Sequence, residues 1–522
     1  MSFVTRRPRE GAARHGRVGA SHARLAVLAA IGLMAFAASP AVAQDPTIPP
    51  ADLTGAGAAA PFIYSHEVAV AKGATAEFRK LEGVAFDPAS NNLYYADTAI
   101  AKGMSDGAGD IQMTENPCGA ILGGTLDASF DLPSLAIVLA GGPYDEANKD
   151  YACSPDAISN PDNLSVDSTG ALWIGEDTDY HHNQMVWVWD GTTLKRFATL
   201  PEGAEATGLR IEPDGTVFLN IQHPAATNLY PFNRATSGVI TGFKAGDDFT
   251  PVPVPTGDAM KTLTVAGGTY QVLGRTGEPI PGDPNGSTFG AIAAPDGSLI
   301  DMCNNPDGNM YLPTASDGSQ GYLYTNWECV PGGVSKLYIA RGNDGTWTTT
   351  DGDQVDFATV GGTQNNCNAS VTPWNTGLTS EEYPPDVQGE YDAFIATKDL
   401  LGKQVGRTAN PLDYGYNIEL TPAGGEDNGI ATTAVKRYAM GRFSKEMALV
   451  MPDSKTAYFG DDGTDRVLYK FVADSAGDLS AGTLSAAKVT QTGNTLGITW
   501  IPLGSSNDSD IKAALDAMSA AY

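Results

Sequence analysis

The chain has 522 residues, of which 42% are hydrophobic and 18% charged, a composition that excludes a disordered acidic tail and a membrane-embedded protein. Its 60 glycines and 33 prolines are typical of a protein built from strands and turns. Lysine and arginine together number 32 against 61 aspartates and glutamates, which gives a net charge of −29. A charge of this sign argues against a nucleic-acid-binding protein.

The first 43 residues have the pattern of a cleavable signal peptide. Six arginines precede an apolar run over 25–37, and small residues at 41–43 offer a cleavage site. The pair Arg6-Arg7 leaves the twin-arginine and general secretory routes both open. No later stretch approaches the ~18 consecutive apolar residues that a membrane helix needs. We therefore expect a periplasmic or secreted protein without membrane insertion.

Export permits disulfides, and the chain has five cysteines. Proximity in the sequence favours the pairs Cys118–Cys153 and Cys303–Cys329, which leaves Cys367. An unpaired cysteine in an exported protein is either an inert buried thiol or a deprotonated metal ligand or nucleophile. The cysteine count by itself does not choose between these roles.

One pattern returns along the chain: an apolar strand, a turn containing aspartate, proline or glycine, and a second apolar strand. Each copy is typical of a β-hairpin. Hairpins repeated at long, irregular spacings indicate an all-β fold, a β-propeller of six to eight blades with insertions. A pair of β-sandwiches is the alternative. The copies span residues 83–98, 163–178, 208–222, 290–302 and 447–462.

Helices are expected to be scarce. The best amphipathic stretch is 511–521, where Ile511, Leu515 and Met518 share one face, and it predicts a short C-terminal helix. The stretch 225–288 is rich in proline and glycine and is interpreted as a loop-rich connector between two groups of blades. We expect residues 44–522 to form a single propeller domain.

Known catalytic motifs are missing from the sequence. Four histidines follow the signal segment, and no HExxH, Walker A or GxSxG pattern is present. The abundant carboxylates favour hard cations such as Ca²⁺ and Fe³⁺. Most of these acids are expected to lie on the solvated surface, so the acids within the hairpin motifs are the candidates for a site.

Several segments resemble the PhoX-type alkaline phosphatase family. NNCNASVTPWNTGLTSEE (365–382) is similar to a family signature in which a cysteine precedes Thr-Pro-Trp and a Glu-Glu pair follows. LYTNWECVPGGVSKLYI (323–339), MGRFSKEMALV (440–450) and YFGDDGTDRVLYKFV (458–472) resemble further segments of the same half of the family pattern.

The other half of the pattern stands in the opposite order. LEGVAFDP (81–88), PDNLSVDSTGALWIGED (161–177) and EATGLRIEPDGTVFLNIQHP (205–224) resemble motifs that follow the cysteine half in the family. The chain thus looks like a circularly permuted member, with 75–224 and 258–503 as its two halves. A propeller tolerates such a permutation because closing the ring brings the chain ends together.

The resemblance implies a propeller of about six blades and a phosphomonoester hydrolase, with Fe³⁺ and Ca²⁺ in a central channel and a metal-bound oxygen as nucleophile. The metal ligands that it implies are Glu82, Glu328, Cys367, Glu381, Glu382 and Glu446. It implies catalytic roles for Glu82, Lys80 and Cys367. Candidates of second rank, as calcium ligands or turn formers, are Asp162, Asp177, Glu205, Asp461 and Asp462.

Three positions depart from the family pattern. Trp327 and Lys445 stand where the family has histidine, and Lys80 stands where it has arginine, but the neighbouring acid remains at each position. We therefore expect an intact metal centre with altered substrate contacts. Lys80 keeps a positive charge but lacks the bidentate grip of arginine on phosphate.

A phosphatase with this composition needs cations at its site, because its acids greatly outnumber its basic residues. Metal ions bind phosphate oxygens and stabilise the charge that develops during displacement, and a thiolate at Cys367 favours iron. Two other functions stay open: a calcium-dependent lactonase or esterase that does not need Cys367, and a non-catalytic binding propeller. The expected partner is a small phosphoester, with no nucleic acid, and the protein is expected to be a monomer.

Overall fold

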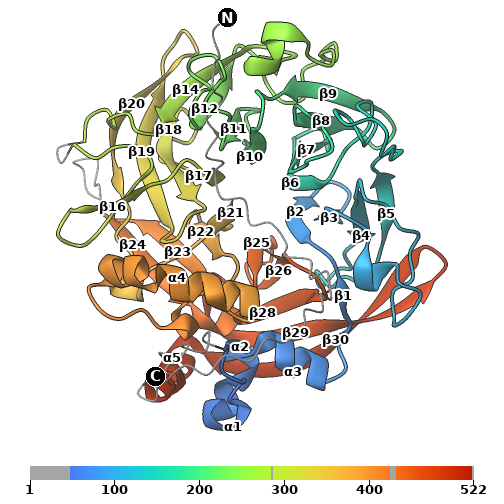
Figure 1. The fold of residues 1–522 in the computed structure, drawn as a ribbon, viewed down its shortest axis with the longest axis vertical. Coiled ribbons are helices and arrows are strands. Elements are labelled where there is room, and N and C mark those ends of the chain that lie inside the picture. The colour runs from blue at the N-terminus through green and yellow to red at the C-terminus, as the bar shows by residue number, and fades with distance from the viewer. Residues whose placement is uncertain (1–46, 284–285, 424–430, 520–522) are drawn as a thin grey trace, which may run out of the picture. The chain divides into compact units, whose positions relative to one another are not determined.

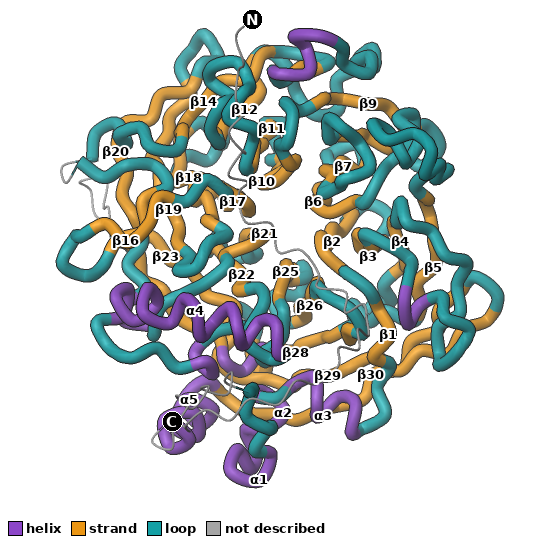
Figure 2. Tube along the Cα trace, viewed as in Figure 1, coloured by secondary structure: helices purple, strands orange, loops and turns teal. Residues whose placement is uncertain are grey.

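The structure is a computed structural model that describes residues 47–283, 286–423 and 431–519. Strands are the main regular secondary structure of these residues, and the helices lie at the periphery (Figure 2). The expected signal peptide falls outside the described residues. Within the described part of the chain, every helix is too short or too polar to cross a membrane.

Six strands lie nearest the centre of the fold (Figure 1). They are β2 (Leu81–Asp87), β6 (Pro161–Val166), β10 (Glu205–Ile211), β17 (Pro306–Pro313), β21 (Asn366–Val371) and β25 (Lys445–Val450). Each contacts the next in this order, and β25 contacts β2, so the six inner strands form a closed ring. Antiparallel partners extend outwards from each one, as in a β-propeller. The expectation of a mostly β chain is confirmed.

The outer strands mostly follow their inner strand along the chain. β2 is continued by β3 (Asn92–Asp97), β4 (Ala120–Thr125) and β5 (Ser134–Ala140), and β6 by β7 (Leu172–Glu176), β8 (Met185–Trp189), β9 (Leu194–Thr199) and β13 (Thr264–Val265). β10 is continued by β11 (Val217–Gln222), β12 (Thr236–Thr241) and β14 (Thr269–Arg275).

The later inner strands are extended in the same way. β17 is continued by β18 (Gln320–Trp327), β19 (Gly333–Arg341) and β20 (Trp347–Gln354), and β21 by β22 (Gly377–Glu381), β23 (Asn417–Pro422) and β24 (Thr432–Arg437). β25 is continued by β26 (Thr456–Asp461), β28 (Tyr469–Ser475), β29 (Asp478–Thr492) and β30 (Thr495–Asn507).

Two pairings join the sheet of β2 to the sheet of β25. β30 pairs with β5 over Thr495–Gly497, and β2 pairs with β26 through Leu81 and Asp461. Nine strands therefore form one sheet, and eight of them close on themselves. Strands near the start of the chain, β2 and β5, thus pair with strands near its end, β26 and β30. A small sheet of β1 (Ala76–Phe78) and β27 (Arg466–Val467) lies beside them.

All five predicted hairpins form. Four of them start at an inner strand, as expected for a repeated unit. The hairpin at 290–302 instead forms β15 (Ala291–Ala293) and β16 (Leu299–Met302), a separate two-stranded sheet. This hairpin is an insertion before β17. Its turn contains the same kinds of residues as the turns of the other four, so the sequence does not mark it as an insertion.

The stretch 225–288 contains more structure than a loop-rich connector. β12 (TSGVIT) and β14 (TYQVLGR) complete the sheet of β10 and β11, and β13 pairs with β9. β-branched and aromatic residues suit these outer strands. The prolines at 251, 253 and 255 lie in the loop between β12 and β13. Their presence made the whole stretch look like a loop in the sequence, including the strands on either side.

The C-terminal helix is confirmed, but other helices were not expected from the sequence. α5 (Asp508–Ser519) buries Ile511, Leu515 and Met518 against the core that α1 (Leu53–Ala56), α2 (Ala60–Ile63) and α3 (Ser65–Ala71) also join. α4 (Gln388–Val405) buries Phe394 and Leu401. Its apolar positions are few, so no periodic stripe marks it in the sequence.

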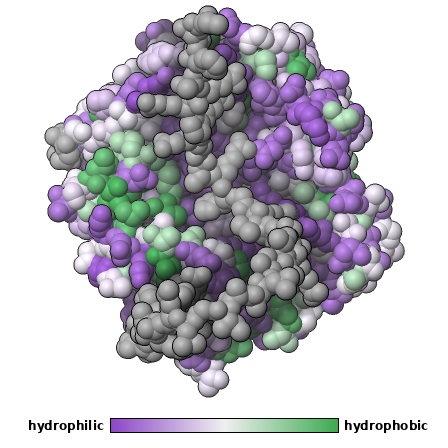
Figure 3. Space-filling model, in the orientation of Figure 1, coloured by the Kyte–Doolittle hydropathy of each residue, from purple (hydrophilic) through white to green (hydrophobic). Residues whose placement is uncertain are grey.

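The hydrophobic core is divided among clusters that lie between and within neighbouring sheets. In one of them Trp173 contacts Phe197, with ring centroids 4.7 Å apart, and in another Trp327 contacts Phe289 at 4.9 Å. Hydrophilic residues make up much of the described surface on the face shown in Figure 3, and hydrophobic residues gather towards one side of it. The buried polar side chains include acids on the inner strands, among them Glu82, Asp162 and Glu446.

Candidate metal centre

Five inner strands share one irregularity at their start. In each, one residue pair forms with the next strand, and then two residues of the inner strand stand opposite one residue of its partner. Such a bulge bends the strand and redirects its side chains. The first pairs are Leu81↔Asp97, Pro161↔Glu176, Pro306↔Trp327, Asn366↔Glu381 and Lys445↔Asp461.

The first residue of every one of these bulges is an acid or a cysteine. All five side chains are buried, although they belong to strands far apart in the sequence. The closed ring of inner strands brings them to the same central region. The five residues, which we call the bulge ligands, are Glu82, Asp162, Asp307, Cys367 and Glu446.

β10 departs from this pattern. Its bulge comes two residues further into the strand, after Thr207↔Asn220, and the first residue of that bulge is Gly208, which has no side chain to act as a ligand. Glu205, the first residue of the strand, contributes a buried carboxylate, and its Oε2 lies 3.0 Å from Nε2 of His223. The sixth inner strand therefore supplies a His–Glu pair instead of a bulge ligand.

A second set of acids comes directly after the strand that pairs with the inner strand. The backbone N–H groups of these residues donate equivalent hydrogen bonds across the end of the hairpin, for example from Glu328 to Asn305 at 2.9 Å and from Glu382 to Asn365 at 3.0 Å. These bonds hold each acid beside a bulge. The members of this set, which we call the centre-facing acids, are Asp177, Glu328, Glu382 and Asp462.

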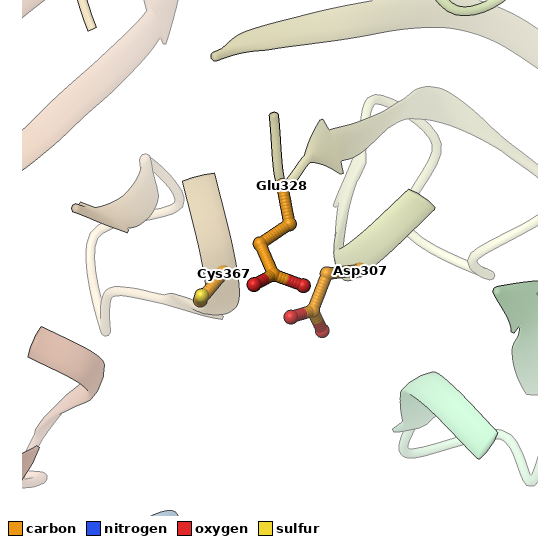
Figure 4. Close-up of side chains that lie close together, drawn as sticks. All are labelled: Asp307, Glu328 and Cys367. Carbon is orange, nitrogen blue, oxygen red and sulfur yellow. The ribbon is translucent and has the colours of Figure 1, made fainter. Parts of the chain in front are cut away.

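Two groups of potential ligand atoms meet at Cys367. Asp307, Glu328 and Cys367 have ligand atoms within 4.8 Å of one another, and so do Cys367, Glu382 and Glu446. The Cys367 thiol donates a hydrogen bond to Oε2 of Glu382 at 2.8 Å. In Figure 4 the carboxylates of Asp307 and Glu328 extend into the space beside the sulfur. Cys367 is thus the shared member of both groups.

Lys80 brings a positive charge to the rim of this cluster. Its Nζ lies 2.6 Å from Glu82 Oε1, 3.8 Å from Asp177 Oδ2 and 4.0 Å from Asp462 Oδ1. These carboxylates raise the pKa of Lys80 well above its usual value, although burial opposes the charged form. Its backbone has φ of 52°, a left-handed conformation that is uncommon for a non-glycine residue. The ammonium group is therefore held at the cluster in its charged form.

Like charges crowd the centre. Burial raises the pKa of Glu328 to about 7, although His223 acts in the opposite direction. Burial and the neighbouring acids Glu382 and Glu446 raise the pKa of the Cys367 thiol. Burial, followed by the charges of neighbouring carboxylates, also raises the pKa of Asp162, Asp307, Glu382 and Glu446. Without added cations this cluster holds protons that carboxyl groups in water would release.

The donor set fits iron and calcium. Among the described residues, one carboxylate oxygen each of Asp162, Asp307 and Asp462 is buried without a hydrogen-bond partner. A buried carboxylate is costly unless a cation or hydrogen-bond donors compensate it. Carboxylate oxygens suit Ca²⁺ and Fe³⁺, and a thiolate among them favours iron.

Two predicted candidates face away from the centre. Glu381 Oε1 lies 3.1 Å from Nζ of Lys436, and its Oε2 accepts hydrogen bonds from the backbone N–H groups of Gly415 and Tyr416 at 3.0 Å. Asp461 accepts a hydrogen bond from the N–H of Val467 at 3.2 Å. Each is the last residue of its strand, and successive side chains of a strand point to opposite sides.

The structure thus brings together most of the ligands implied by the resemblance, and one more acid. Glu82, Glu328, Cys367, Glu382 and Glu446 converge, whereas Glu381 is occupied within its own sheet. Asp307 joins the cluster without having been singled out in the sequence. A signal was present, because PDGNMYL (306–312) parallels PDNLSVD (161–167), which carries Asp162.

The cysteine pairing is confirmed. Cys118–Cys153 and Cys303–Cys329 are disulfides, and Cys367 is free and buried.

A family model for alkaline phosphatase PhoX matches residues 50–225 and 335–521, more than half of the chain. The chain belongs to this family. The predicted resemblance to PhoX is therefore confirmed. The matched PhoX segments include Glu82, Cys367, Glu382 and Glu446, whereas Glu328 lies in the unmatched stretch between them.

The solved structures that match this PhoX family member share little sequence with it. A Pseudomonas fluorescens PhoX in complex with vanadate, a transition state analogue, is 20% identical with a TM-score of 0.34; the match covers 48% of this chain and 59% of that one. A Xanthomonas campestris gluconolactonase is 11% identical with a TM-score of 0.35, covering 74% and 85%. The Dos1 propeller is 11% identical with a TM-score of 0.33, covering 82% and 94%. No curated protein matches in sequence. Likenesses at these TM-scores say nothing about activity.

Proposed function

We propose that the protein is an exported, metal-dependent phosphatase that hydrolyses phosphate monoesters. The observation that carries this proposal is the convergence of a free, buried thiol with carboxylates from separate inner strands. Membership of the PhoX alkaline phosphatase family supports it. The charge deficit of the cluster supports metal dependence, because no lysine or arginine other than Lys80 lies within 4.0 Å of Glu82, Glu328, Glu382 or Glu446 in the described part of the chain.

The proposed ligands form two groups that share Cys367. Cys367, Glu382 and Glu446 would hold iron, because the group combines one thiolate with two carboxylates. Asp307 and Glu328 would form the second group with the same sulfur, and Glu82 and Asp162 would complete the ring with further oxygen atoms for Ca²⁺. Bound Fe³⁺ and Ca²⁺ would supply Lewis-acid stabilisation of the phosphate oxygens and an activated nucleophile.

Lys80 would bind the substrate phosphate. Its ammonium group is fixed by Glu82, and its side chain remains 24% exposed, so it can be reached from the rim of the cluster. A lysine acts on phosphate as a point charge with rotatable donors, and it does not impose the planar geometry that arginine imposes. Glu82 would therefore both complete the ring and position Lys80. Cys367 would act as a ligand and not as a nucleophile, because its sulfur is buried against Glu382.

The remaining proposals concern the chain as a whole. We take residues 44–522 to be one six-bladed propeller, with each inner strand starting a blade, and the family match in two segments to reflect a circular permutation. Two disulfides are typical of an oxidising compartment, which agrees with a periplasmic or secreted protein. The substrate would be a small phosphoester, and the protein a monomer.

Metal analysis combined with turnover of p-nitrophenyl phosphate tests the proposed function. Protein purified from its exported form should contain iron and calcium, and prolonged chelation should remove both the metal and the activity. Restoring the two ions together should restore turnover. Protein without either metal, or full activity in chelator, would contradict the proposal.

A further inference from the structure

The disulfide Cys303–Cys329 lies beside the second ligand group. Cys329 directly follows Glu328, and Cys303 stands four residues before Asp307. The cross-link therefore joins the two chain segments that carry these two carboxylates. Both acids lie near the end of the β17–β18 hairpin, where Pro306↔Trp327 is the last pair of the ladder.

Few other bonds hold this end of the hairpin closed. Pro306 has no backbone N–H to donate to β18. In the described part of the chain, two hydrogen bonds join Asn305 and Glu328 beyond this pair. The N–H of Glu328 donates to the carbonyl of Asn305 at 2.9 Å, and Nδ2 of Asn305 donates to the carbonyl of Glu328 at 3.2 Å. Strand ends held by so few hydrogen bonds open locally more often than the rest of a sheet. A covalent link at this point limits that opening.

The same disulfide is connected to the first ligand group. The carbonyl of Cys329 accepts a hydrogen bond from the N–H of Asn365 at 2.7 Å, and the carbonyl of Asn365 accepts one from the N–H of Glu382 at 3.0 Å. Asn365 also stands two residues before Cys367. The backbone of Cys329 thus touches the segment that supplies both the shared sulfur and Glu382.

The second disulfide offers a comparison within the same chain. Cys118 precedes β4, and Cys153 lies in the loop before β6, eight residues ahead of Pro161. The hairpin of β6 and β7 also starts at a proline, but its end is closed by side chains: Glu176 Oε1 accepts from the N–H of Ser159 at 2.9 Å. Cys118–Cys153 therefore does not join two ligand-bearing strands, although the carbonyl of Cys118 accepts a hydrogen bond from the N–H of Asn160 at 2.8 Å and the carbonyl of Asn160 accepts one from the N–H of Asp177 at 3.1 Å.

We propose that Cys303–Cys329 is a positioning cross-link that holds Asp307 and Glu328 for metal binding, so that this ligand group binds metal tightly only in the oxidised chain. The inference rests on the proposed metal-dependent function. Its consequence is that the centre is completed after export. The cross-link forms when the two thiols lose two electrons and two protons to a disulfide oxidant by thiol–disulfide exchange.

The test compares Cys303→Ala/Cys329→Ala with Cys118→Ala/Cys153→Ala. Alanine is chosen because Cys303 lies in an apolar cluster with Ile292 and Trp327, where serine would bury a hydroxyl group. We expect the first double variant to lose bound metal and to release the remainder to a chelator roughly tenfold or more faster than wild type, in the range found when groups that orient metal ligands are removed. The second double variant should keep the wild-type metal content and release rate.

A reversible experiment covers the case in which the first double variant fails to fold. In the Cys118→Ala/Cys153→Ala protein the remaining disulfide is Cys303–Cys329. Metal is removed, the disulfide is reduced with a dithiol, the dithiol is washed out without air, and Ca²⁺, which cannot oxidise the two thiols as Fe³⁺ would, is titrated by calorimetry. The reduced form should bind Ca²⁺ roughly tenfold more weakly, and reoxidation should restore the affinity.

The outcomes separate the two proposals. Equal metal content and release in both double variants, or equal affinity of the reduced and reoxidised protein, would overturn the positioning role while leaving the proposed function in place. Wild-type protein that binds neither ion would overturn both. Because the readouts are metal content, release rate and affinity, they do not depend on activity.

Discussion

Two sets of acids lie one residue apart in the hairpins and have opposite surroundings. Glu176, Glu381 and Asp461 end their strands and point into the sheets; we call them the sheet-facing acids. Glu176 accepts from Trp187 Nε1 at 2.7 Å and lies 2.9 Å from Nδ1 of His181, and Glu381 pairs with Lys436. The centre-facing acids that follow them instead meet carboxylates from other hairpins.

The comparison shows which of these acids have partners within the polypeptide that balance their charge. Burying a carboxylate costs several kcal/mol unless a cation or several donors compensate it. Glu176 and Glu381 find their partners within the chain, whereas the cluster of Cys367, Glu382 and Glu446 places acids against one another. A protein that retains such a cluster needs cations from solution to balance it. The predictions below test this contrast.

The largest expected effect is on activity, at the centre-facing position. Glu382→Gln and Cys367→Ala should each lower kcat/KM for p-nitrophenyl phosphate by roughly 100-fold or more, because each removes a ligand from the shared group. Bound iron, counted per protein, should fall as well. The metal-free Glu382→Gln protein should be at least as stable as metal-free wild type, because one of several repelling charges is gone. Wild-type metal content in either variant would contradict the ligand assignment.

At the sheet-facing position the effect should be on stability. Glu381→Gln leaves Lys436 buried opposite an uncharged group, and breaking a buried ion pair in this way typically costs about 3–5 kcal/mol. Urea unfolding of the metal-free protein measures the loss. Metal bound per folded molecule should stay at the wild-type value, and Glu382→Gln is the matched control one residue away. Loss of metal without loss of stability would place Glu381 among the ligands.

A smaller effect is expected at the rim. Lys80→Ala should lower kcat/KM roughly tenfold, since one charge-assisted hydrogen bond to phosphate is worth about 1.5–3 kcal/mol in general. Lys80→Arg should retain most of the activity because the charge remains. Steady-state kinetics on p-nitrophenyl phosphate distinguish the two variants. If Lys80→Ala and Lys80→Arg were equally impaired, the length of the side chain and not its charge would matter.

The last prediction concerns the pH dependence of the metal-free protein. Burial raises the pKa of Glu328 to about 7, above its ordinary value near 4.3. Between these values the folded chain binds more protons than the unfolded chain, so stability is highest below pH 4.3 and falls as pH rises through 7. We expect the free energy of unfolding in chelator to be roughly 2 kcal/mol lower at pH 8 than at pH 5.

Added metal should remove this dependence, because cations stabilise the ionised carboxylates. Glu328→Gln in chelator should have a shallower pH profile than wild type. Metal-free protein that gained stability between pH 5 and pH 8 would mean that the centre-facing acids have partners of their own, and the contrast with the sheet-facing acids would fail.

Much of the fold and of the site could be predicted from local sequence patterns. The hairpins followed from turn residues between alternating apolar runs, and the disulfides followed from the spacing of the cysteines. Weak periodicity concealed α4, and prolines in the adjoining loop concealed β12 and β14. These elements are stabilised mainly by packing on neighbouring sheets, which no local window of sequence contains.

By itself, the sequence determined the hairpin repeat, the unpaired Cys367 and the family, because each depends on residues close together in the chain or on a shared motif. The tertiary structure decided which acids belong together. It brought Asp307 into the cluster and directed Glu381 away from it. The physical reason is that a bulge and the alternation of a strand set the direction of each side chain, while closure of the ring sets which side chains meet.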